Sequence, residues 1–246
     1  MRVISLVPSI TELLFDLGMD DSVVGLTKFC VHPREKWTSL PRIGGTKTVN
    51  HERLALLKPD LIIANKEENT REDVERLREN YSVLLTDIRT VEDAFALFFE
   101  LGEALGRTQR ALELHEPLRA AWENAKGVVM GERTAYAIWR DPLMFAGSDT
   151  YISAVLEWFG WHNVIADARY PERSIDALAA LKPQRLMLSS EPYPFSDKHI
   201  ADYQSLLTGC SVECVDGELF SWYGTRMQYT PEYVKSLVAS SDFKRP

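Results

Sequence analysis

The chain has 246 residues, and its 36 Asp and Glu side chains outnumber its 28 Lys and Arg side chains, giving a formal net charge of −8 at pH 7. Hydrophobic residues make up 45% and charged residues 26%, as in globular proteins that stay in solution. The acidic balance argues against a nucleic-acid or anionic-membrane partner. No apolar run approaches the roughly 18 residues that a membrane-spanning helix needs.

The first hundred residues alternate short apolar runs with amphipathic stretches. The apolar runs predict strands at Arg2–Val7, Val23–Leu26, Leu61–Ala64 and Val83–Leu85. Helices are expected after Ser9, Asn50, Thr70 and Thr90, with a short one near Arg34–Trp37 and a loop at 42–48. Ser9 and Glu12 have the spacing of a capping box for a helix over Ile10–Leu17, which Gly18 ends. Such alternation predicts a largely parallel sheet with helices on its faces.

A longer helix is predicted over Thr108–Lys126. Its apolar residues recur at helical spacing, Gly106 ends the preceding helix, and Thr108 can cap the new one. Pro117 lies well inside this stretch and costs one intrahelical hydrogen bond.

The second half repeats the alternation. Strands are expected at Thr134–Trp139, Leu143–Ala146, Leu186–Leu188 and Val212–Val215, with a short apolar run at Val164–Ile165. Helices are expected before Gly160, after Ser174, around Asp197–Leu207 and from Thr230, whose next residue is a proline suited to the first helical turn. Residues 216–226 are expected to form a loop.

Two segments resemble each other at a constant offset. Asn50–Glu67 and Ser174–Glu191 align with an offset of 124 residues, so that Leu57-Lys58-Pro59 falls on Leu181-Lys182-Pro183 and Glu67 on Glu191. Each reads as a capped helix, a break at Lys-Pro and a buried strand. We therefore predict two similar Rossmann-like α/β lobes with mostly parallel sheets, joined by one long rigid helix. The expected bounds are 1–107 for the first lobe, 108–127 for the helix and 128–246 for the second lobe.

Several segments resemble the class III substrate-binding proteins of ABC importers, the group that contains cobalamin- and ferric-siderophore-binding proteins. The matching pieces are ISLVPSITELLFDLG at 4–18, IGG at 43–45, LLKPDLIIA at 56–64, LGEALGR at 101–107, AGSDTYISAVLEWFG at 146–160, LKPQRLMLSSEPYPF at 181–195 and the loop at 222–226. The resemblance implies two α/β lobes spanned by one helix. It also implies a binding protein, expected to be monomeric, that captures a corrinoid or iron-chelate ligand and delivers it to a membrane permease.

Candidate ligand-binding residues share a position at the ends of loops that follow strands or precede helices. They are Pro8, Ser9, Phe29, Lys47, Trp139, Arg140, Trp222, Tyr223 and Arg226. Aromatic rings with a few cationic donors suit a large, flat ligand with a polar rim. The alternative is that Trp139 and Trp222 are packing residues and that Arg226 holds its own loop.

Glu67 and Glu191 come just past a strand in each repeat. The resemblance implies that one acidic residue per lobe docks on arginines of the permease, and the offset selects Glu67 over its neighbour Glu68. The alternative reading is a pair of solvated glutamates. Exposed contacts of this kind chiefly set encounter rate and register.

Metal binding and catalysis are not predicted. Cys30 and His32 would supply only two ligands, and the five histidines form no cluster with ligand spacing. The three cysteines include no CxxC pair, and no phosphate-binding loop, GxSxG turn or zinc-protease motif is present. We assign no catalytic residue, no metal site and no cofactor. A chelatase-like enzyme acting on a tetrapyrrole, with His32 as its base, and a leaderless carrier or sensor remain the alternatives.

The start of the chain does not read as a signal peptide. Met1 and Arg2 run directly into Val3–Val7, and Pro8 ends this apolar run too early for a signal's core. We expect a cytoplasmic protein or the mature or leaderless form of an exported one. The resemblance favours a periplasmic or cell-surface location.

Overall fold

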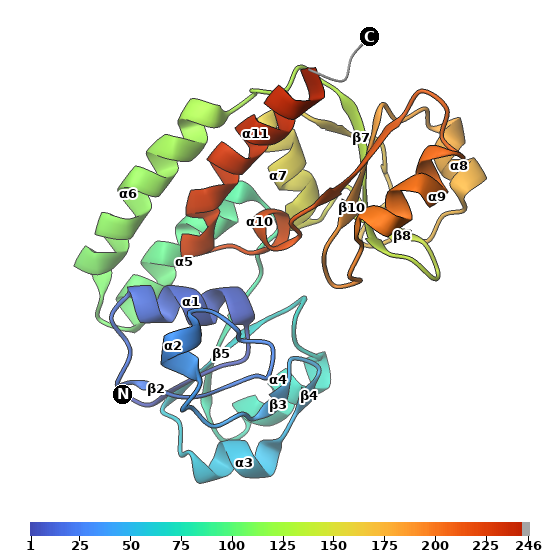
Figure 1. Cartoon of the computed structure of the whole chain (residues 1–246). Coiled ribbons are helices and arrows are strands. Elements are labelled where there is room, and N and C mark those ends of the chain that lie inside the picture. Colours follow the sequence, from blue (N-terminus) through green and yellow to red (C-terminus); the bar gives the residue numbers. More distant parts are fainter. Residues whose placement is uncertain (243–246) are drawn as a thin grey trace. The chain divides into compact units, whose positions relative to one another are not determined.

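The computed structural model describes residues 1–242 (Figure 1), so the last four residues of the predicted second lobe lie outside the described range. The chain divides into two compact units. Unit 1 comprises Met1–Ile88, Glu92–Arg119 and Trp222–Met227, and unit 2 comprises Arg89–Val91, Ala120–Ser221 and Gln228–Pro246. The division places a short segment from near the C-terminus, Trp222–Met227, in unit 1.

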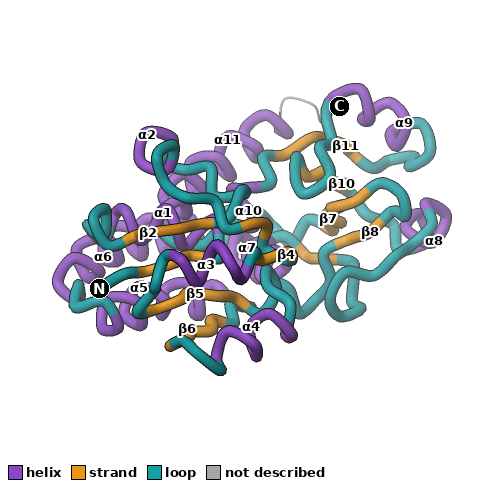
Figure 2. The backbone as a smooth tube through the Cα atoms, turned by 90° about the horizontal axis from the view of Figure 1, so that it is seen from below, coloured by secondary structure: helices purple, strands orange, loops and turns teal. Residues whose placement is uncertain are grey.

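Unit 1 is built on a four-stranded sheet in the order β2-β1-β5-β6, with all neighbours parallel (Figure 2). The strands are β1 (Val3–Ser5), β2 (Val23–Leu26), β5 (Leu61–Asn65) and β6 (Ser82–Thr86). Its helices are α1 (Pro8–Asp16), α2 (Arg34–Trp37), α3 (His51–Leu56), α4 (Arg71–Arg78) and most of α5 (Val91–Ala104). A buried apolar core that includes Ile4, Leu54 and Ile62 holds the sheet to its helices.

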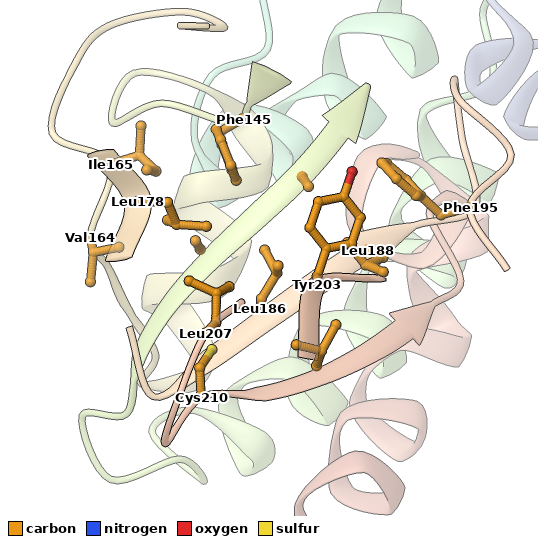
Figure 3. Packing of buried hydrophobic residues seen from close by; sticks show 13 residues of the cluster. Phe145, Val164, Ile165, Leu178, Leu186, Leu188, Phe195, Tyr203, Leu207 and Cys210 are labelled. Atoms are coloured by element: carbon orange, nitrogen blue, oxygen red, sulfur yellow. The ribbon is translucent and has the colours of Figure 1, made fainter. Parts of the chain in front are cut away.

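Unit 2 repeats this order in β9-β7-β10-β11, again parallel throughout, and adds β8 antiparallel to β7. The strands are β7 (Arg133–Trp139), β8 (Met144–Phe145), β9 (His162–Asn163), β10 (Arg185–Ser189) and β11 (Ser211–Val215). The helices are α7 (Tyr151–Phe159), α8 (Ile175–Ala180), α9 (Ile200–Gln204), α10 (Glu218–Ser221) and α11 (Thr230–Asp242), with the 3-10 turn η1 (Asp197–His199). A second 3-10 turn, η2 (Thr225–Tyr229), begins in the unit 1 segment and ends in unit 2. Figure 3 shows its core, in which Leu186 and Leu188 of β10 lie among Leu178, Phe195 and Tyr203.

The prediction of two similar α/β lobes with parallel sheets is confirmed by these two sheet orders. The predicted long helix is α6 (Thr108–Ala125), which is continuous with Pro117 inside it. The boundary between the units falls within α6, between Arg119 and Ala120.

The repeat is visible in backbone detail. Lys58 and Lys182, at the predicted Lys-Pro breaks, both have a left-handed backbone with φ of 46° and 50°. Asn50 and Ser174 cap α3 and α8 by accepting from the backbone N–H three residues on. The offset of 124 residues therefore relates equivalent positions in three dimensions.

Two local predictions were wrong or incomplete. Ser9 and Glu12 form no capping box, because α1 begins at Pro8, whose fixed φ suits the first helical position, and Val7 makes no side-chain cap. The short apolar run at Val164–Ile165 is not a strand; the preceding residues, His162–Asn163, form β9, and the Asn163 side chain accepts from the Ile165 N–H.

Two predicted loops contain regular structure. Residues 42–48 include the start of a short antiparallel hairpin, β3 (Gly44–Gly45) with β4 (Thr48–Val49), and residues 216–226 include α10 and the start of η2.

Candidate functional site

The loop after β2 carries the exposed candidate Phe29, and a small network of buried hydroxyl and thiol groups stabilises the base of this loop. The Thr11 hydroxyl lies 2.8 Å from the Ser5 hydroxyl and 3.1 Å from the Cys30 sulfur, and Thr27 lies 3.3 Å from the same sulfur. Arg42 donates to the Thr27 and Cys30 carbonyl oxygens. The loop is thus fixed at its base, while Phe29 is 49% exposed at its tip.

Cys30 has a structural role in this loop. Its side chain is fully buried, and this burial raises the pKa of the thiol above its usual range, so the thiolate that a metal requires is disfavoured. Among the described residues, no group of three or more His, Cys, Asp or Glu side chains is placed to hold a metal ion.

The segment Trp222–Met227 packs onto α1 within unit 1. Arg226 forms a two-point pair with Glu12, with Nε–Oε2 of 2.8 Å and Nη2–Oε1 of 3.0 Å. The Arg226 guanidinium carbon lies 5.3 Å from the centroid of the Trp222 ring, and Trp222 meets His32 edge-on at 5.4 Å. Trp222 and Tyr223 are both buried, so the exposed aromatic ring among the unit 1 candidates is that of Phe29.

The other unit 1 candidates differ in exposure. Pro8 and Ser9 are buried in the first turn of α1. Lys47 is exposed between β3 and β4. Asn69 anchors this hairpin by donating to the Thr46 carbonyl oxygen at 2.8 Å. Phe29 and Lys47 are therefore the unit 1 candidates whose side chains are open to solvent, each on an anchored loop.

In unit 2, Trp139 is the last residue of β7 and Arg140 follows it, and both contact Tyr193. The Trp139 and Tyr193 rings meet edge-on at 5.7 Å, and the Trp139 indole N–H donates to the Asp141 carbonyl oxygen. A hydrogen bond with Tyr193 raises the pKa of Arg140, whose Nη2 also lies 3.2 Å from an Asp202 carboxylate oxygen. Trp139 remains 38% exposed.

Glu67 and Glu191 occupy matching turns, two residues after the last residue of β5 and of β10. The Glu67 N–H donates to the Asn65 side chain at 2.8 Å, and the Glu191 N–H donates to the Ser189 hydroxyl at 3.4 Å. The Glu191 carboxylate also accepts from the Ser221 hydroxyl at 2.7 Å. Both residues are half-buried at the carboxyl end of a parallel strand, where ligands and partners of α/β folds usually lie.

The model of the periplasmic binding protein family matches residues 3–204. The chain belongs to this family. The match covers most of the chain and agrees with the resemblance drawn from the sequence motifs. No helix in the described part of the chain has the length and apolar character to cross a membrane.

Members of this family with related sequences come from several bacteria. The chain is 27% identical to a vitamin B12-binding protein of Vibrio vulnificus over 198 residues, 76% of this chain and 71% of that protein. It is 25% identical to a vitamin B12-binding protein of Pectobacterium atrosepticum, covering 97% of this chain and 88% of that protein. It is 26% identical to an uncharacterized ABC transporter substrate-binding lipoprotein of Bacillus subtilis, with coverage of 76% and 62%.

Solved structures share the fold over nearly the whole chain. The periplasmic vitamin B12-binding protein of Vibrio cholerae superposes with a TM-score of 0.77 at 22% identity, with 96% of each chain covered. A periplasmic heme-binding protein from Pseudomonas aeruginosa gives a TM-score of 0.80 at 22% identity, covering 97% of this chain and 91% of the other. Both confirm the two-lobed α/β fold of this family.

Three residues of the site were not singled out from the sequence. Tyr193 contacts both unit 2 candidates, and its place two residues after Glu191 in the segment EPYPF was a usable signal. Glu12 and Asp202, the carboxylate partners of Arg226 and Arg140, lie 214 and 62 residues away from them. No sequence pattern points to pairs so far apart.

Proposed function

We propose that this chain is the substrate-binding protein of an ABC importer. The family match over residues 3–204 carries the proposal, since it spans both units and all of the candidate loops except the one at 222–226. The B. subtilis relative is named as an ABC transporter substrate-binding lipoprotein, and this supports a membrane permease as the partner.

We propose a flat, metal-centred macrocycle as the ligand, either a corrinoid of the cobalamin type or an iron chelate such as haem. Relatives are named for vitamin B12 and solved structures for heme, and the two ligands share a broad planar ring with a polar rim. Phe29 and Trp139 supply exposed aromatic surfaces, one in each unit. Lys47 and Arg140 are the exposed cations that would meet polar groups of the rim.

We further propose that Glu67 and Glu191 dock on the permease. They stand at equivalent positions of the repeat, each at the carboxyl end of a sheet strand, and one acidic residue per unit would fix the register on a two-part partner. A periplasmic or cell-surface location, a monomeric state and the absence of any catalysed reaction belong to the same proposal.

The direct test is to incubate the purified protein separately with cyanocobalamin, haemin and a ferric siderophore, remove free ligand by desalting and record the visible spectrum. We expect one coloured complex of one ligand per chain, with the ligand recovered chemically unchanged. Trp139→Ala should weaken that complex, because it removes an exposed ring while the core stays intact.

Two outcomes contradict the proposal. No retained colour with any of the three ligands would argue against this ligand class. Insertion of metal into free porphyrin with turnover would favour the chelatase-like alternative.

A further inference from the structure

Two carboxylates on one face of α1 hold the segment Trp222–Met227. Glu12 and Asp16 are four residues apart and so lie one turn from each other on the helix. Glu12 receives both hydrogen bonds of the Arg226 fork, and Asp16 accepts from the Thr225 hydroxyl. The Glu12 and Arg226 side chains are only 13% and 14% exposed, so this pair is largely withdrawn from solvent.

The same segment leaves no slack between these contacts. Gly224 has φ of +93°, and a Cβ at this position would stand 3.2 Å from the Leu13 Cβ of α1. The backbone at Gly224 therefore lies close to α1, directly before the anchored side chains of Thr225 and Arg226. The segment is held at three consecutive residues, Gly224, Thr225 and Arg226.

The clamp between Glu12 and Arg226 supports the exposed loop after β2. Arg226 lies against the Trp222 ring, and Trp222 lies edge-on against His32. His32 belongs to the same loop as the exposed apolar residues Phe29 and Val31. Direct contacts thus connect Glu12 to the loop that carries Phe29, although Glu12 is distant from this loop in sequence.

We propose that Glu12 is a positioning residue for ligand binding, a role that rests on the proposed function. By accepting from Arg226 Nε and Nη2, Glu12 keeps the guanidinium beside the Trp222 ring instead of extended toward a ligand. Trp222 and His32 then hold the Phe29 loop in one arrangement before the ligand arrives. A surface ordered in advance costs less free energy to bind than one that must be ordered on binding.

Unit 1 contains a second forked pair, more exposed than the first, that serves as a control. Arg119 on α6 makes an equally forked contact with Glu92 on α5, at 2.5 Å and 3.1 Å, and its guanidinium carbon lies 4.8 Å from the Phe95 ring. This pair repeats the chemistry of carboxylate, guanidinium and aromatic ring on two other helices, α5 and α6. Glu92→Gln therefore reports what the loss of such a pair does away from the candidate site.

The experiment measures cyanocobalamin and haemin binding by calorimetry for the wild type, Glu12→Gln, Glu92→Gln and the exchange Glu12→Arg with Arg226→Glu. We expect Glu12→Gln to lower the association constant of the bound ligand about tenfold, and the exchange to restore it to within about threefold of wild type, because the pair is re-formed. Glu92→Gln should bind as wild type does. In protein labelled with 5-fluorotryptophan, the ligand-free Glu12→Gln variant should show a shifted and broadened Trp222 resonance, assigned with Trp222→Phe, and unchanged resonances for the other tryptophans.

Each remaining outcome overturns a defined claim. If the Glu12→Gln variant binds the ligand as tightly as the wild type does, the positioning role is overturned. Failure of the exchange to restore affinity also overturns it, because Arg226 would then act on the ligand through its own charge. A wild type that binds neither probe overturns the proposed macrocyclic ligand, and an unchanged Trp222 resonance in Glu12→Gln then overturns the clamp as well.

Discussion

The strand–turn segments around β5 and β10 can be compared position by position through the 124-residue offset. Arg2 and Arg133 play the same part in the two units, since their guanidinium groups donate to the Leu57 and Leu181 carbonyl oxygens at the ends of α3 and α8. The backbone N–H of each arginine also donates to a side chain, that of Asp60 in unit 1 and that of Gln184 in unit 2, and these two residues are related by the same offset.

The two units differ at the first residue of these equivalent strands. The first residue of β5 is Leu61, whereas the first residue of β10 is Arg185, which is 2% exposed and pairs with Glu132 and Glu213. The Glu132 carboxylate also accepts from the Trp161 indole N–H at 3.2 Å. The comparison teaches that hydrogen bonds to the backbone hold the repeated geometry, while the side chain beside it can be apolar or charged.

The largest expected effect comes from breaking the charged interior of unit 2. Arg185→Leu should lower the free energy of unfolding by about 3–5 kcal/mol, because it leaves two carboxylates near the core without their cation. Urea unfolding followed by circular dichroism measures the loss. The triple variant Arg185→Leu, Glu132→Leu, Glu213→Leu should recover most of it, and a single variant as stable as wild type would show that the charged cluster is not needed.

The second prediction uses the equivalent core leucines, Leu54 in α3 and Leu178 in α8, both fully buried. Leu54→Ala and Leu178→Ala should each cost about 2–5 kcal/mol, since each removes buried methyl groups and leaves a cavity. The two losses, measured by the same urea titration, should agree within about 1 kcal/mol if the frames are equivalent. A much larger loss in one unit would show that the cores around Leu54 and Leu178 are not equivalent.

A smaller, stabilising effect is expected at the left-handed lysines. Lys58→Gly and Lys182→Gly should each raise the free energy of unfolding by about 0.5–1 kcal/mol. Glycine adopts positive φ without a Cβ clash, and the relief of this clash is larger than the entropic cost of the extra freedom that glycine has in the unfolded chain. Thermal melting can resolve the gain. Alanine at either position keeps the clash and serves as the control, so a gain with alanine would contradict the explanation.

The smallest expected effect concerns pH in unit 1. His115 packs among Phe95, Phe98 and Phe99, and burial, followed by the nearby Arg119, lowers the pKa of its imidazole. The folded protein therefore favours the neutral ring, so stability present above the unfolded-state pKa of about 6.5 is lost as pH falls below it. Protection factors for amide exchange, which correct for the slower intrinsic exchange at lower pH, should fall in α5 and α6 from pH 7 to pH 5 more than in α8, and His115→Leu should remove that difference.

Much of the frame was predictable from local patterns, since caps at Asn50 and Ser174, breaks at Lys58 and Lys182 and short apolar runs are written in consecutive residues. The site was less predictable because its contacts are long-range. Glu12 had the spacing of a capping residue, yet its partner is Arg226, far along the chain. Trp139 and Trp222 were alike as sequence candidates, and only burial separates the half-exposed ring from the buried one.

The central claim is that the two repeats each give one acidic residue to a permease. It is tested most directly by ligand uptake into vesicles that contain the cognate importer, with free-ligand affinity measured in parallel. Glu67→Lys combined with Glu191→Lys should abolish uptake and leave affinity unchanged, the single variants should be intermediate and more sensitive to salt than wild type, and Glu68→Lys should behave as wild type. Normal uptake by the double variant, or loss of ligand affinity in its place, would contradict the account.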